Sequence, residues 1–171
     1  MKLKSILENL LTEIGDNVVV PPGAKYSVSM TKGAFTFDFH QLKYVVTVTL
    51  PIHQFKSDQE EYTKITMMVD FTTTSTAFGL TLQNKALLLM SNVVGGLTEW
   101  LNRWKEKFNS NELIEIVYIK FNAQKEEDEE GNRRSKMYKL FLQKFAQKHG
   151  TSVSFSGGTN EVIAKFDKLI Y

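Results

Sequence analysis

The sequence contains no cysteine, and this absence removes several classes of protein at once. Disulfide-stabilised scaffolds, thiolate metal sites and enzymes with a cysteine nucleophile are all excluded. No apolar run reaches the length needed to cross a bilayer. Glu8 and Asn9 interrupt the apolar N-terminal residues, which therefore predict an amphipathic helix rather than a signal peptide. We expect a soluble protein of the cytoplasm, without a membrane partner.

An excess of charge of either sign is lacking too. The 171 residues carry a formal net charge of +2, so the whole chain is not built to bind nucleic acid. Two common catalytic signatures, the Gly-x-Ser-x-Gly elbow and the phosphate-binding P-loop, are also missing. The three histidines, His40, His53 and His149, lie far apart without the spacing of a metal site, so we expect no metal.

What the chain does contain is an ordinary globular composition with clear periodicity. With 42% hydrophobic and 23% charged residues, and no internal repeat, it predicts one domain over residues 1–171. Apolar residues recur at helical spacing over residues 3–14 and 87–104, and residues 132–149 predict a basic third helix. Strands are expected over residues 26–30, 35–39, 44–50, 62–71, 114–121, 151–155 and 161–166. The predicted fold class is α+β, with a mixed, largely antiparallel sheet flanked by three helices.

Two segments that contain glycine carry expectations of their own. Lys32-Gly33 predicts the turn between the first two strands. Gly95-Gly96 lies inside the long helix, where each glycine costs about 1 kcal/mol relative to alanine. We expect that another element packs closely against this point, in preference to a bend in the helix. Phe35, Phe37 and Phe39 alternate as the core face of a strand does, rather than as a base-stacking platform.

The order of these elements resembles the GNAT acetyltransferase superfamily, in which an antiparallel meander precedes a long helix, a strand, a second helix and a final strand pair. Phe121-Asn-Ala followed by Arg134-Ser-Lys-Met-Tyr138 is also similar to a group of short bacteriophage proteins. There, a strand ending in Phe-x-Ala precedes an Arg-x-Lys-Leu-Tyr helix, and some members are regarded as acetyltransferase-like. The resemblance implies a single GNAT-like domain.

The resemblance also implies a place for acetyl-CoA. Working acetyltransferases carry an Arg/Gln-x-x-Gly-x-Gly/Ala turn before the long helix, whose backbone N–H groups hold the cofactor pyrophosphate. The corresponding residues 74–85 have one glycine and lack this pattern. The candidates that are left for cofactor binding are Ser75, Gly79, Thr81 and Lys85. This departure from the family pattern implies a degenerate acetyl-CoA loop. Whether the chain uses acetyl-CoA as a cofactor stays an open question at this point.

Tyr138 is the candidate catalytic residue. It lies where the superfamily often has a tyrosine that protonates the departing CoA thiolate, and an aligned phenol of pKa about 10 can serve as that acid. The simpler interpretation is that its ring packs beside Met137 and Phe141. Asp38 and Asp70 are alternative general bases, each more typical of an ordinary strand-end carboxylate.

Positive charge is concentrated in the predicted basic helix. Six lysines and arginines and no acidic residues lie between Gly131 and Gly150. The anion-binding candidates near its start are Arg133, Arg134, Lys136 and Lys139. A helix N-terminus with such charges suits a nucleotide, a CoA phosphate or a nucleic-acid backbone. The acidic run 126–130 just before it favours a neutralised, solvated face instead.

Three functions follow. The favoured hypothesis is a bacteriophage-type protein with a GNAT-like fold that has lost acetyl-CoA binding and binds a protein partner in the host or virion. The second is an acetyl-CoA-dependent N-acyltransferase. The third is nucleic-acid or nucleotide binding through residues 132–149. An edge strand of the terminal pair would also allow a homo-oligomer.

Overall fold

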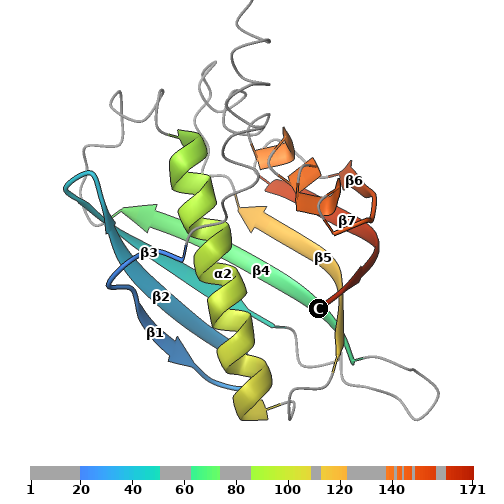
Figure 1. The fold of residues 1–171 in the computed structure, drawn as a ribbon, viewed down its shortest axis with the longest axis horizontal. Coiled ribbons are helices and arrows are strands. Elements are labelled where there is room, and N and C mark those ends of the chain that lie inside the picture. Colours follow the sequence, from blue (N-terminus) through green and yellow to red (C-terminus); the bar gives the residue numbers. More distant parts are fainter. Residues whose placement is uncertain are drawn as a thin grey trace, which may run out of the picture.

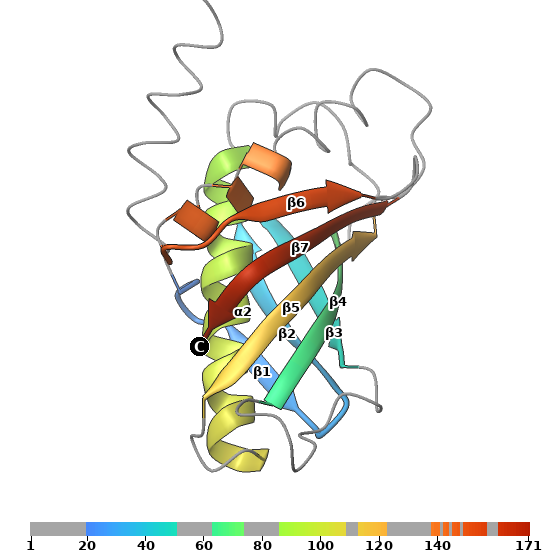
Figure 2. The same cartoon turned by 90° about the vertical axis from the view of Figure 1, so that its right-hand side faces the viewer.

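The structure is a computed structural model that describes residues 20–50, 63–73, 86–108, 113–122, 138–140, 142–143, 145–147, 149–156 and 161–171. In these residues a long helix crosses one face of a seven-stranded sheet (Figure 1). Figure 2 shows the same helix from the side, lying along one face of the strands. The predicted α+β class with a largely antiparallel sheet is confirmed.

The sheet has the strand order β1-β2-β3-β4-β5-β7-β6. Its strands are β1 (Lys25–Val28), β2 (Lys32–Phe39), β3 (Leu42–Thr49), β4 (Thr63–Thr73), β5 (Ile114–Asn122), β6 (Val153–Ser156) and β7 (Glu161–Ile170). Neighbours pair antiparallel except β4 and β5, which pair in parallel. A parallel pair needs a crossover connection, and the long helix lies in that connection.

The long helix, α2 (Ala86–Phe108), supplies one side of the core. Its buried apolar side chains recur every three or four residues: Leu89, Met90, Val93, Val94, Leu97, Trp100, Leu101 and Trp104. Helical residues also occur at 138–140, 142–143 and 145–147, within the predicted basic helix. The predicted helix at residues 3–14 lies outside the described part of the chain.

The inner face of the sheet is apolar and rich in aromatic rings. Phe35 and Phe37 of β2 and Tyr44 of β3 are buried, which confirms that the alternating phenylalanines form a core face. Their rings stack in sequence, with centroids 6.1 Å apart for Phe35–Phe37 and 5.5 Å apart for Phe37–Tyr44. Stacked rings of this size add to the stability that burial itself provides.

The turn between β1 and β2 differs from the prediction. It spans Ser29 to Lys32, where the Ser29 N–H donates to the Lys32 carbonyl oxygen at 2.9 Å. The prediction of a Lys32-Gly33 turn was therefore wrong, because Gly33 lies inside β2. A Cβ atom at Gly33 would overlap the Ser27 carbonyl oxygen and the indole of Trp100. This glycine is needed for close approach, not for a turn.

The same reasoning applies to the glycine pair in α2. A Cβ atom at Gly96 would overlap the ring of Phe35. The expectation that another element packs closely at this point is confirmed, and that element is β2. The helix tolerates the low helical propensity of glycine here because the missing side chain lets a buried aromatic ring reach the helix backbone.

Candidate functional site

The parallel pair β4–β5 is the place to look for a site. The carboxyl ends of two parallel strands lie at the same edge of a sheet, where ligands of many α/β folds bind. α2 begins at that end of the molecule (Figure 1). The ladders on both sides of β5 shift register between Ile116 and Tyr118, so Val117 has no partner in either one. A bulge of this kind often lies beside a functional site.

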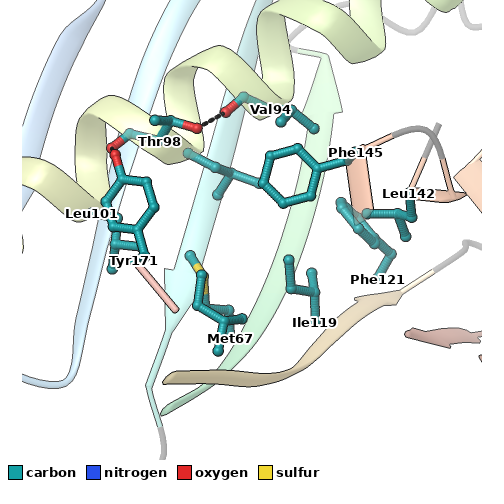
Figure 3. A pocket seen from close by; sticks show the side chains of 11 residues that line it. Met67, Val94, Thr98, Leu101, Ile119, Phe121, Leu142, Phe145 and Tyr171 are labelled. Carbon is teal, nitrogen blue, oxygen red and sulfur yellow. Dashed lines mark hydrogen bonds between the residues drawn. The ribbon is translucent and has the colours of Figure 1, made fainter. Parts of the chain in front are cut away.

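A small cavity lies below this edge, between α2, β4, β5 and the side chains of Leu142 and Phe145 (Figure 3). Its volume is about 30 Å³, whereas a cavity needs about 10–15 Å³ to hold one water. Ligand pockets usually measure about 300–1,000 Å³. Nine of its eleven lining residues are apolar, and the exceptions are Thr98 and Tyr171. The lining side chains therefore leave a cavity that is too small for a ligand of ordinary size.

The hydroxyl groups of Thr98 and Tyr171 are both engaged with α2. Thr98 Oγ1 donates to the Val94 carbonyl oxygen at 3.0 Å, which is the dashed line in Figure 3. The Tyr171 hydroxyl lies 2.7 Å from Asn102 Oδ1, to which it donates. Burial raises the pKa of Tyr171 above its ordinary value, the Asn102 hydrogen bond lowers it, and the charge of Glu99 raises it. Tyr171 is thus a protonated hydrogen-bond donor at neutral pH.

Tyr171 also ties β7 to its neighbours. Its N–H and carbonyl oxygen pair with Ile114 of β5 at 2.8 and 2.9 Å. Lys105 Nζ donates to the same carbonyl oxygen at 3.2 Å. The sequence analysis missed this cluster. The available signal was the spacing of Thr98 and Asn102, because residues four apart share one face of a helix.

Tyr138, the candidate general acid, packs against the core. Its ring stacks on that of Phe121 with centroids 5.7 Å apart and an angle of 23°. Phe121 is buried near the carboxyl end of β5. The predicted neighbours Met137 and Phe141 lie outside the described residues. A packing role for the Tyr138 ring is therefore present, whereas its role as an acid stays a prediction.

The other candidates divide between the described and undescribed parts of the chain. The cofactor-binding candidates fall outside the described residues: Ser75, Gly79, Thr81 and Lys85. So do the anion-binding candidates Arg133, Arg134 and Lys136, while Lys139 is an exposed helical residue directly after Tyr138. Asp38 and Asp70 are exposed on β2 and β4, with β3 between them. These two carboxylates do not form an acid–base pair.

The described residues do not form a recognisable metal site. No group of three or more histidine, aspartate or glutamate side chains in this part of the structure could hold a metal ion. The His40 ring meets Phe39 edge-on at 4.4 Å in the β2–β3 turn, and the His149 ring lies 4.5 Å from that of Phe145. Among the helices that the structure describes, none has the length and apolarity to cross a membrane.

Comparison with known proteins gives no assignment. No protein-family model matches the sequence. No curated protein and no solved structure is significantly similar to the chain either. The functional argument therefore depends on the residues and geometry of this chain alone.

Proposed function

We propose that this protein has a GNAT-like fold whose acyl-CoA site has been lost, and that it acts by binding a protein partner rather than by catalysis. The cavity under the parallel strands carries this proposal, because about 30 Å³ of apolar space cannot take a cofactor arm. In addition, residues 74–85 lack the glycine pattern that would hold a pyrophosphate.

The topology supports the GNAT-like part of the proposal. A meander of antiparallel strands runs from β1 to β4, and the crossover helix α2 leads to the parallel strand β5. The terminal pair β7–β6 then extends the sheet beyond β5, and the resemblance likewise has a final strand pair. Fold alone does not assign an activity, and the small size of the cavity is what supports binding over catalysis in this proposal.

The test is thermal unfolding of the full chain with and without acetyl-CoA. A ligand present at about 100 times its Kd stabilises a protein by about 2.7 kcal/mol, which raises the Tm of a chain this size by about 5–10 °C. We expect no change in Tm with acetyl-CoA or CoA at about 1 mM, a concentration that would saturate a micromolar site. A clear rise in Tm that disappears in Lys85→Ala would contradict the proposal.

One observation favours the alternative of an N-acyltransferase. The Tyr138 ring rests on Phe121, close to the edge where the parallel strands end. In such an enzyme, Tyr138 would protonate the departing thiolate of CoA. The measurement is release of free CoA from acetyl-CoA in the presence of amine acceptors. Release that falls at least tenfold in Tyr138→Phe would establish this alternative, and its absence agrees with the binding role.

A further inference from the structure

The two edge strands of the sheet, β1 and β6, differ in the hydrogen bonds that their backbone groups accept from other parts of the chain. At the β1 edge, α2 covers the strand and the turn after it with side-chain donors. Each of three carbonyl oxygens accepts one hydrogen bond: Ser27 from Trp100 Nε1 at 3.0 Å, Met30 from Trp104 Nε1 at 3.0 Å, and Val28 from Lys107 Nζ at 3.2 Å. The Ser29 N–H donates to Lys32, so Ser29 and, by alternation, Ser27 face β2, and within β1 only the Val28 oxygen of these three points outward. Its bond to Lys107 occupies one group that an additional strand would need.

The opposite edge, β6, presents open backbone groups. The Asp167 N–H donates to the Ser152 carbonyl oxygen at 3.0 Å, which fixes the residues that face β7. Because facing alternates along an antiparallel ladder, Ser154 also faces β7, opposite Lys165. The N–H and C=O groups of Val153 and Phe155 then point away from the sheet. Within the described part of the chain, no hydrogen bond reaches these outward groups.

The side chains of β6 do nothing to block pairing. Residues 151–156 include no charged residue and no proline, the two devices that most often protect an edge. Ser154 and Ser156 are exposed, while Val153 and Phe155 lie half-buried on the core side of the sheet. Figure 2 shows β6 as the outermost strand beyond β7. The edge is therefore uncharged, polar on one side and apolar on the other.

We propose that β6 is a self-association surface that pairs antiparallel with β6 of a second copy of this chain, about a two-fold axis at Ser154. In this register, Val153 lies opposite Phe155 of the second copy, so the two residues exchange the N–H and C=O groups that point outward. No other register on this strand uses all of these groups within β6.

The chemistry of β6 fits a second copy for two further reasons. Self-pairing places identical side chains near the axis, and an uncharged strand avoids the repulsion that like charges would cause there. The half-buried Val153 and Phe155 of each copy also become neighbours on the core side, which removes more apolar surface from water. Since the contact is short, we expect a weak dimer that depends on concentration.

A single introduced cysteine tests the register directly, because the chain has no cysteine of its own. Ser154 would face its counterpart in a non-hydrogen-bonded pair with a Cα–Cα distance of about 4.5 Å, which a disulfide can span. We expect mild oxidation of full-length Ser154→Cys to give a covalent dimer. The matched control is Ser27→Cys, an exposed serine on β1 beside Val28, whose outward carbonyl oxygen is bonded by Lys107, so this variant should stay monomeric. Equal cross-linking of both variants would overturn the proposal.

Sedimentation equilibrium gives the second, non-covalent test. We expect the 19.6 kDa chain to dimerise as its concentration rises to about 1 mM. Ser154→Lys and Ser154→Asp should each raise the dimer Kd about fivefold, and an equimolar mixture of the two should restore it. Ser27→Lys should leave the Kd unchanged. A chain that stays monomeric at about 1 mM, or a Ser154→Lys variant that dimerises like the parent with unchanged circular dichroism, would overturn self-pairing.

Discussion

The β1 end of the sheet and the β7 end are both fastened to α2, but by different kinds of contact. At the β1 end the contacts are close. Indole N–H groups of α2 donate to backbone carbonyl oxygens, and Gly33 and Gly96 let aromatic rings approach the backbone. At the β7 end a half-buried Tyr171 hydroxyl, bonded to Asn102, makes the connection. The helix α2 thus contacts β1 and the turn after it through tryptophan side chains, and the residue that follows β7 through a polar side chain.

The comparison shows that burial alone does not describe how a sheet edge is protected. β1 and β6 have the same length and the same alternation of half-buried and exposed residues. Among the described residues they differ in the side-chain donors that reach them. The outward Val28 carbonyl oxygen of β1 accepts a hydrogen bond from Lys107, whereas no described side chain donates to the outward groups of Val153 and Phe155 on β6.

The largest effect should come from removing Trp100, which closes the β1 end. Its side chain is fully buried and its Nε1 donates to the Ser27 carbonyl oxygen. Trp100→Ala should lower the free energy of unfolding by about 3–5 kcal/mol, measured by urea denaturation. Trp100→Phe keeps most of the volume and loses the donor, so it should cost less. A cost for Trp100→Ala below about 1 kcal/mol would mean that this end is not held as described.

A smaller effect is expected from Gly96→Ala, which tests the close contact between α2 and β2. An exposed helical glycine replaced by alanine gains about 1 kcal/mol of stability. Here the new methyl group would overlap the Phe35 ring, so we expect a net loss of about 2 kcal/mol in denaturation.

The control for this substitution is the double variant Gly96→Ala with Phe35→Leu. The smaller leucine leaves space for the methyl group, so the two changes together should cost less than the sum of the single changes. Additive losses, or a stabilised Gly96→Ala, would show that the ring and the helix backbone are not in the contact described.

Much of the fold could be predicted from the sequence because alternation and helical spacing are local signals. The phenylalanines of β2 and the apolar face of α2 were located in this way. The role of Gly33 could not be predicted, because the residue that requires a glycine there is Trp100, which is far away in the sequence. A glycine in a tight turn and a glycine under an indole ring look alike until the tertiary contact is known.

The candidate site was less accessible to sequence reasoning. The family resemblance made Tyr138 a candidate, but nothing local indicated that Phe121 would receive the Tyr138 ring. The Tyr171–Asn102 bond joins residues 69 positions apart, so no short motif encodes it. Contacts of this kind depend on how the strands and helix meet in space, which periodicity does not specify.

The smallest effect concerns pH and compares Tyr26 at the β1 end with Tyr171 at the β7 end. Burial raises the pKa of both phenols above the ordinary value of 10.0, and the charge of Glu99 also raises each. Opposing contributions come from Arg103 for Tyr26 and from the Asn102 hydrogen bond for Tyr171.

A raised pKa in the folded state means that the stabilisation is complete below about pH 10 and is lost as the pH rises further. The urea midpoint should therefore hold steady from neutral pH to about pH 9 and fall above about pH 10, less steeply in Tyr26→Phe and in Tyr171→Phe. If the slope is the same in the parent and both variants, neither phenol contributes, and the difference between the two ends resides in the tryptophan and glycine contacts alone.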